Sequence, residues 1–130
     1  MKRFIALVLS ILTSLAVVSC NKTPEQDITY ERINAEEAKA IMDRESDYII
    51  IDARTQSEYD EGHIPGAILI PEYEIANKAG ELLKDKNQLI LVYCRSGRRS
   101  KIAAQALVDL GYNNVKEFGG IIDWKYEIEQ

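Results

Sequence analysis

The sequence has few of the residues that build metal centres and disulfides. It contains two cysteines, Cys20 and Cys94, and a single histidine, His63. Because so few soft ligands cannot fill the coordination shell of a zinc ion, we expect no metal and no cofactor. If Cys20 is modified, Cys94 has no partner for an internal disulfide. This excludes dithiol oxidoreductase and two-cysteine reductase mechanisms within one chain.

The chain also lacks excess positive charge and an apolar run long enough to cross a bilayer. Its formal net charge is −5, and we find no repeat or low-complexity segment. An acidic chain has no general electrostatic reason to bind nucleic acid, so no nucleic-acid partner is expected. The apolar stretch over residues 4–18 is interrupted only by three hydroxyl residues. It is shorter than the roughly 20 residues of a spanning helix.

The first 20 residues have the layout of an export signal. Lys2 and Arg3 precede the apolar stretch, which ends in the letters VVSC. This ending resembles a bacterial lipobox, in which the cysteine is acylated and becomes the first mature residue. We therefore expect a lipoprotein signal peptide over 1–19, a lipidated Cys20 with a polar tether over 20–28, and a lipid-anchored location in the bacterial cell envelope. The alternatives are a plain signal peptide and an uncleaved anchor, and the choice of membrane stays open.

Residues 29–130 alternate between helical and strand patterns, and we expect them to form one domain. Capping patterns and apolar spacing predict helices over 34–43, a short stretch after Thr55, 72–83, 100–110 and a C-terminal stretch from Ile121. Apolar runs rich in β-branched residues predict strands over 48–52, 67–70, 88–93 and 114–118. This alternation predicts an α/β fold with a central parallel sheet flanked by helices on both faces.

The stretch LVYCRSGRRS, residues 91–100, has the features of a reactive loop. Cys94 follows a predicted strand and precedes a predicted helix, and ligands of parallel sheets bind at such strand ends. Gly97 permits a sharp turn in which N–H groups and the helix dipole can favour an anion. These groups and the nearby guanidinium groups would stabilise a thiolate, so we predict that Cys94 is a nucleophile. The rest of the candidate loop comprises Arg95, Ser96, Gly97, Arg98, Arg99 and Ser100.

Four motifs resemble those of the single-domain rhodaneses. They are DAR at 52–54, EGHIPGA at 61–67, YCRSGRRS at 93–100 and GGIIDW at 119–124. The resemblance extends over roughly residues 30–129 and implies a rhodanese-like fold in which Cys94 carries sulfane sulfur as a persulfide. It implies a sulfurtransferase that takes sulfur from a small anionic donor such as thiosulfate and passes it to cyanide or a thiol. The two glycines of the last motif would let the chain pass close to the active loop.

The remaining assignments divide between donor binding and structural support. Arg95 and Arg98 are expected to hold the anionic donor by paired hydrogen bonds. Arg99 either shares that role or ties the loop to a carboxylate, and a solvated helix start is the alternative for the whole basic cluster. His63 is interpreted as part of a structural turn, with a general base as the alternative. The residues assigned to structural support are Asp52, Arg54 and His63.

Two other function classes compete with sulfur transfer. A cysteine-dependent phosphatase uses a C-x5-R loop, but position 100 holds Ser100 and the arginine comes one residue early, at Arg99. The shorter loop would fit one sulfur atom better than a phosphoryl group. The second class is a rhodanese-like sulfur carrier, sensor or binding module without turnover. The sequence leaves the physiological donor, the acceptor and any protein partner open.

Overall fold

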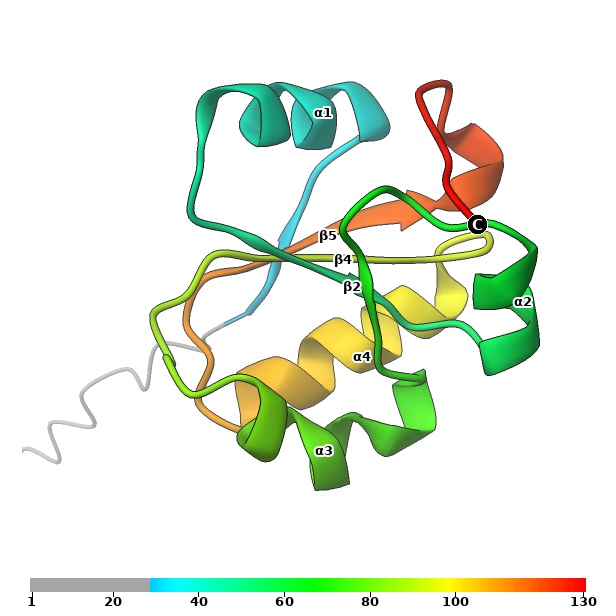
Figure 1. The fold of residues 1–130 in the computed structure, drawn as a ribbon. Coiled ribbons are helices and arrows are strands. Elements are labelled where there is room, and N and C mark those ends of the chain that lie inside the picture. Colours follow the sequence, from blue (N-terminus) through cyan, green and yellow to red (C-terminus); the bar gives the residue numbers. More distant parts are fainter. Residues whose placement is uncertain (1–28) are drawn as a thin grey trace, which may run out of the picture.

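The computed structural model describes residues 29–130 (Figure 1). The predicted signal peptide, Cys20 and the tether lie outside these residues. Within the described part of the chain, none of the helices combines the length and the apolar character that crossing a membrane requires.

One five-stranded parallel sheet lies at the centre, in the order β1-β5-β4-β2-β3. The strands are β1 (Glu31–Arg32), β2 (Ile49–Asp52), β3 (Ile68–Leu69), β4 (Ile90–Cys94) and β5 (Val115–Gly120). All residues of the central strand β4 are buried, as the continuous apolar run predicted. Because the strands are parallel, the carboxyl ends of β2, β4 and β5 meet at one edge of the sheet.

Helices cover both faces of this sheet, which confirms the predicted α/β architecture (Figure 1). The α-helices are α1 (Ala35–Arg44), α2 (Gln56–Glu61), α3 (Ile75–Leu82) and α4 (Arg98–Asp109), and short 3-10 turns are η1 (Glu72–Glu74) and η2 (Ile121–Asp123). Helix α1 packs in an apolar cluster on one face, whereas α3 and α4 contribute to a second cluster on the other. Helix α2 lies beside the loop that follows β4 (Figure 1).

The predicted capping patterns are present at the starts of α1 and α2. Asn34 Oδ1 accepts the N–H of Glu37 at 2.8 Å, and the Glu37 carboxylate accepts the N–H of Asn34 at 3.0 Å. Thr55 and Glu58 form the same reciprocal box before α2. These boxes satisfy N–H groups that the first turn of a helix leaves without partners, so each helix begins where the sequence predicted.

The prediction of a C-terminal helix from Ile121 is wrong. Only the η2 turn forms, and the chain then runs irregularly to residue 130. Trp124 packs on Phe118 with ring centroids 5.9 Å apart, and its indole N–H donates to the carbonyl of Glu127 at 3.0 Å. Glu129 pairs with His63 through backbone hydrogen bonds of 2.8 and 2.9 Å. The pairing with His63 is a long-range contact that requires an extended chain, and it outweighs the local helical pattern.

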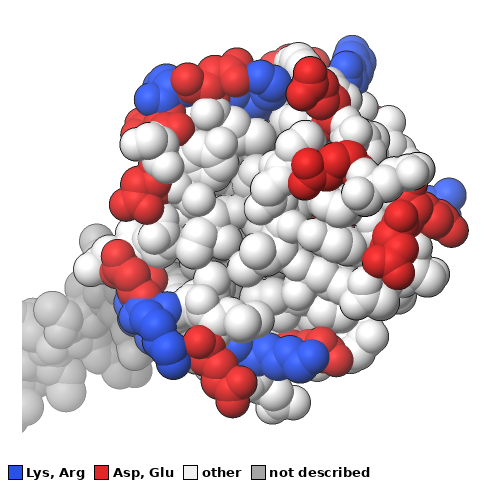
Figure 2. All heavy atoms as spheres, in the orientation of Figure 1, with Lys and Arg blue, Asp and Glu red and all other residues white. Residues whose placement is uncertain are grey.

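The face seen in Figure 2 has charged side chains around its rim and an uncharged centre. The segment 62–71, GHIPGAILIP, crosses in front of the sheet in the green part of Figure 1 and holds no lysine, arginine, aspartate or glutamate. Acidic and basic groups alternate around the rim of this face (Figure 2). This face therefore has no broad basic surface.

Candidate active site

Cys94 is the last residue of β4 and is only 1% exposed. The backbone N–H of Gly97 donates to its sulfur at 3.0 Å. The thiol in turn donates to the hydroxyl oxygen of Ser100, with 3.3 Å between Sγ and Oγ. Gly97 has a φ of 106°, in the left-handed region that glycine adopts without strain, so the chain turns at once from the strand into α4. The helix starts at Arg98, two residues earlier than predicted.

The early start places two arginines in the first turn of α4, which contains no acidic residue. Positive side chains there add to the positive end of the helix dipole and make the region attractive to anions. Arg99 forms a two-point ion pair with Glu58 of α2, with N–O distances of 2.7 and 2.9 Å. This pair lowers the pKa of the Glu58 carboxyl from 4.5 to about 2, chiefly through the Arg99 hydrogen bond. Of the two roles considered for Arg99, the structure shows the tie to a carboxylate.

Arg95 and Arg98 lie at the protein surface on either side of Gly97. Neither takes part in an ion pair among residues 29–130. Their guanidinium groups are therefore not committed to a carboxylate within this part of the chain. Ser96 is exposed at the tip of the turn.

A buried carboxylate that the sequence analysis did not single out lies beneath the loop. Glu117 of β5 is 1% exposed, and its Oε1 accepts hydrogen bonds from the Ser100 hydroxyl at 2.7 Å and from the N–H of Gly119 at 2.8 Å. Alternation along a strand places residue 117 on the same face as the buried Val115. An acidic residue at an inward position was the signal that could have identified it.

Gly120 of β5 lets this strand approach the active loop closely, as predicted for the last motif, whereas a Cβ at Gly119 would meet no atom within 4 Å. A Cβ at Gly120 would overlap the carbonyl group of Arg95, and one at Gly97 would lie 3.5 Å from the Cα of Gly119. The N–H of Ile122 donates to the same Arg95 carbonyl at 3.2 Å. The loop is therefore packed against β5 at Gly120, where the backbone contact admits no side chain.

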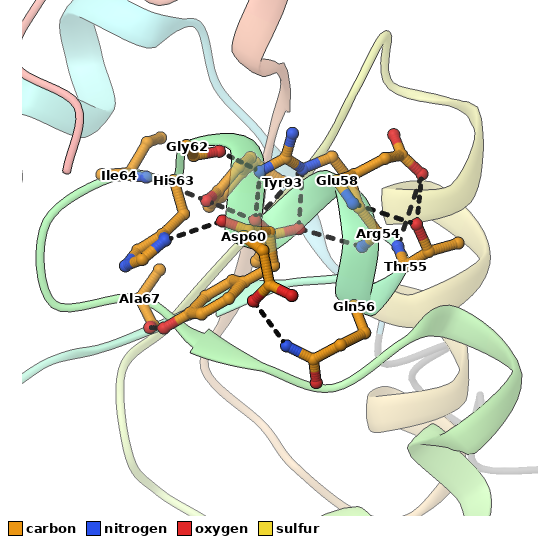
Figure 3. Close-up of polar contacts among 12 residues, drawn as sticks. Arg54, Thr55, Gln56, Glu58, Asp60, Gly62, His63, Ile64, Ala67 and Tyr93 are labelled. Atoms are coloured by element: carbon orange, nitrogen blue, oxygen red, sulfur yellow. Dashed lines mark hydrogen bonds and ion pairs between the residues drawn. The ribbon is translucent and has the colours of Figure 1, made fainter. Parts of the chain in front are cut away.

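Asp52 and Arg54 form the buried network expected of them, together with Tyr93 (Figure 3). The Asp52 carboxylate accepts from the Arg54 guanidinium at 2.7 Å and from the Tyr93 hydroxyl at 2.7 Å. Arg54 also donates to the carbonyl of Gly62 at 2.6 Å, and the Tyr93 hydroxyl accepts the N–H of Ile64 at 3.1 Å. Burial, followed by the charge of Asp52, raises the pKa of Tyr93. The network fixes the residue next to Cys94.

His63 lies in a turn that is bound to the C-terminal segment, and it is 7% exposed. Its ring stacks on Tyr59 with centroids 3.7 Å apart, and Nδ1 lies 3.0 Å from the carbonyl of Tyr59 (Figure 3). Its other nitrogen lies 3.3 Å from a carboxylate oxygen of Glu129. Both ring nitrogens thus face structural partners, an arrangement that fits the turn interpretation better than a general base.

A cavity of about 310 Å³ adjoins the loop. Its lining consists of Arg54, Glu58, Glu61, Arg95, Ile121 and Ile122. A larger cavity of about 460 Å³ between α1 and the C-terminal segment contains no residue of the 94–100 loop, whereas the smaller one is lined by Arg95 but not by Cys94. Within residues 29–130, no three histidine, cysteine, aspartate or glutamate side chains are grouped as a metal would require.

The fold and the site define an α/β protein with a cysteine loop at the carboxyl edge of a parallel sheet. The family model described as Rhodanese-like domain matches residues 34–127. The chain therefore belongs to the rhodanese family, and the predicted fold and family are confirmed.

Several relatives are proteins named as sulfurtransferases. The chain is 38% identical over 73 residues to the thiosulfate sulfurtransferase PspE of Escherichia coli, covering 56% of this chain and 70% of PspE. It is 31% identical over 99 residues to the thiosulfate sulfurtransferase GlpE of Pseudoalteromonas translucida, covering 75% and 91%. The adenylyltransferase and sulfurtransferase UBA4 of Meyerozyma guilliermondii is 34% identical over 107 residues, which are 77% of this chain but only 25% of UBA4.

Solved structures agree with this assignment. A rhodanese with anions from Escherichia coli superposes with a TM-score of 0.60 at 34% identity, covering 64% of this chain and 98% of that one. A rhodanese-related protein from Thermoplasma volcanium gives a TM-score of 0.66 at 31% identity, covering 77% and 98%.

Proposed function

We propose that this protein is a rhodanese-type sulfurtransferase in which Cys94 carries the transferred sulfur as a persulfide. The observation that carries the proposal is the setting of the Cys94 sulfur. It lies at the end of the central strand, receives the Gly97 N–H, and is flanked by Arg95 and Arg98, which have no ion-pair partner among residues 29–130. The family and its thiosulfate sulfurtransferase members support the same activity.

In the first step, the Cys94 thiolate attacks the outer sulfur of thiosulfate. A new sulfur–sulfur bond forms, the donor's own sulfur–sulfur bond breaks, and sulfite leaves with the electron pair. Arg95 and Arg98 hold the sulfonate oxygens by charge-assisted hydrogen bonds. The Gly97 N–H stabilises negative charge on sulfur.

In the second step, cyanide or a small thiolate attacks the outer sulfur of the persulfide. Cys94 leaves as a thiolate, so the active group is regenerated without a further reactant. Charge is conserved in both steps, because an anion enters and an anion of equal charge leaves.

The geometry disfavours the phosphatase alternative. Ser100 occupies the position at which that chemistry requires an arginine, and its hydroxyl donates to the Glu117 carboxylate at 2.7 Å. No arginine at position 100 is therefore available to bind the phosphoryl oxygens.

Intact mass spectrometry of the purified protein after incubation with thiosulfate tests the proposal. We expect a gain of one sulfur atom that is lost on adding cyanide, with release of thiocyanate. The Cys94→Ser variant should gain nothing. A parent protein that is folded but gains no sulfur would contradict thiosulfate transfer. A protein that gains sulfur but releases none to cyanide or small thiols would be a carrier without turnover.

For the location, we propose a lipid anchor on Cys20 that places the domain at a membrane surface of the cell envelope. The support comes from the sequence alone, because the charged start, the apolar stretch and the VVSC ending are typical of lipoprotein processing. Growth with a labelled fatty acid should label the parent protein but not a Cys20→Ala variant. An unlabelled parent protein would refute the anchor.

A further inference from the structure

Glu117 is a buried carboxylate that is only loosely paired with a cation. The nearest one is Arg32, whose Nε lies 3.7 Å from Oε2 and whose side chain is 65% exposed. The other contacts of the carboxylate are two neutral donors, the Ser100 hydroxyl and the Gly119 N–H. Burying a carboxylate is costly when no cation is closely paired with it. A glutamine could accept the same two hydrogen bonds at a lower free-energy cost of burial. We therefore interpret the negative charge of Glu117 as a sign that the carboxylate has a function.

The hydrogen bonds around Ser100 determine where its hydroxyl hydrogen points. Its oxygen lies 2.7 Å from Glu117 Oε1, 3.2 Å from the carbonyl of Gly97 and 3.3 Å from that of Gly119. All three neighbours only accept, and the single hydroxyl hydrogen goes to the nearest and charged one. A lone pair of the same oxygen therefore faces the Cys94 thiol, 3.3 Å away. The groups form a continuous chain from S–H through the hydroxyl to the carboxylate.

We propose that Glu117 accepts the proton of the Cys94 thiol through the Ser100 hydroxyl. The S–H bond breaks as a new O–H bond forms on Ser100, and the original hydroxyl bond breaks as an O–H bond forms on Glu117. The products are a thiolate, a hydroxyl that now donates to it, and a neutral carboxylic acid. The buried group keeps a single negative charge throughout, so ionising the thiol places no second charge beneath the loop.

The same proton stays on Glu117 during sulfur transfer, a statement that rests on the proposed function. The thiolate and the persulfide anion each carry one negative charge, so neither step requires the proton to return. Glu117 acts through Ser100 and does not touch the substrate, which makes it a positioning residue for the charge of Cys94.

The other charged groups near Cys94 and Glu117 are paired, distant or exposed. They are the Arg99–Glu58 pair from α4 and α2, the Asp52–Arg54 pair at the end of β2, Arg32 on β1, and the exposed Arg95 and Arg98. Glu117 is the one carboxylate in residues 29–130 that is hydrogen-bonded to the partner of the thiol.

The decisive variant is Glu117→Gln, which keeps the shape and the accepting oxygen but cannot take a proton. The measurement is the rate at which iodoacetamide alkylates Cys94 at neutral pH in the full protein. We expect a loss of roughly a hundredfold, the lower end of what a positioned proton acceptor contributes. A bystander carboxylate predicts the opposite sign, because removing a nearby negative charge favours a thiolate. An unchanged or faster rate in a folded Glu117→Gln protein would overturn the proposal.

Two further variants separate a relay from independent effects. Ser100→Ala removes the middle of the chain, and combining it with Glu117→Gln should slow alkylation no more than either change alone. Losses that multiply would show that the two residues act separately and would overturn the relay. The matched control is Glu31→Gln, which changes an exposed residue on the neighbouring strand β1. In this variant, iodoacetamide should alkylate Cys94 at the parent rate. Alkylation uses no sulfur donor, so its outcome is independent of whether the protein transfers sulfur.

Infrared spectroscopy gives a readout that a structural role would not move. The measurement is a difference spectrum, in which the spectrum of the alkylated parent protein is subtracted from that of the sulfur-loaded parent protein. This difference spectrum should contain the C=O band of a carboxylic acid. The Glu117→Gln protein should lack this band. A loaded parent protein without the band would refute the placement of the proton on Glu117.

Discussion

The ion pair between Glu58 and Arg99 should stabilise the protein by a measurable, pH-dependent amount. The fall of the Glu58 pKa from 4.5 to about 2 sets an upper bound of about 3 kcal/mol, at about 1.4 kcal/mol for each unit. The two side chains are 24% and 22% exposed. Solvent screening therefore reduces the expected coupling to about 1–2 kcal/mol, which is above the range of fully exposed pairs.

A double-mutant cycle of Glu58→Gln and Arg99→Gln, read by urea unfolding at neutral pH, measures this coupling. Glutamine can replace glutamate in a capping box, so the Glu58 variant keeps the cap with Thr55 and isolates the charge. Glu61→Gln on the same helix has no ion pair among residues 29–130 to lose and serves as the control. A coupling below about 0.3 kcal/mol, within the error of additivity, would refute the reasoning.

The pH dependence of the same pair has a definite sign. Because the folded protein lowers the pKa of Glu58, the stabilisation is complete above 4.5 and is lost as the pH falls toward about 2. The difference in unfolding free energy between the parent protein and Glu58→Gln should shrink over this window. A difference that persists unchanged below it would show that the effect comes from packing and not from charge.

Three other substitutions test the loop and its support. Gly120→Ala should slow sulfur loading roughly a hundredfold, because the new methyl group overlaps the Arg95 carbonyl. A displacement of reacting groups by about 1 Å has an effect of this size. A parent-like rate in the mass assay would contradict the close packing. Arg95→Ala should raise the KM for thiosulfate about tenfold, the cost of one charge-assisted hydrogen bond, with a smaller effect on kcat. A fall in kcat with an unchanged KM would instead show that Arg95 acts only in the transition state. Tyr93→Phe should lower the unfolding free energy by about 1–3 kcal/mol, because Asp52 and the Ile64 N–H lose a buried partner; a neutral effect in urea unfolding would contradict the network.

Local signals predicted most of the fold. The capping pairs placed the starts of α1 and α2, and the run over 88–93 identified the central strand. The short strand β1 was missed, because Glu31 and Arg32 are exposed polar residues that belong to the sheet only through pairing with β5. The C-terminal helix was predicted wrongly for a related reason. The pairing of Glu129 with His63 involves a residue far away in the sequence that no local pattern reveals.

The residues of the candidate site also divide into those that local sequence reveals and those that only the fold reveals. Cys94 and Gly97 could be found because a strand end, a turn and a helix start follow one another in the chain. The role of Arg99 could not be decided, since its partner Glu58 lies 41 positions away. Glu117 lies 17 positions after Ser100, and only the folded chain brings its carboxylate beneath the loop. The sequence therefore identified the candidate nucleophile Cys94 but not the distant residues that pack beside its loop.

The burial of Cys94 makes the loop a filter for size. A cysteine that is 1% exposed can react only with molecules narrow enough to enter the turn around it. Thiosulfate, cyanide and small thiols are narrow, whereas the disulfide of a folded protein is flanked by a bulky backbone. A mixed disulfide with such a protein would require the loop to lift away from Gly119 and Gly120, to which it is closely packed. If the proposed sulfur transfer is correct, the access route shields the Cys94 thiol from macromolecular oxidants, and selection among sulfur compounds depends on their width as well as on their reactivity.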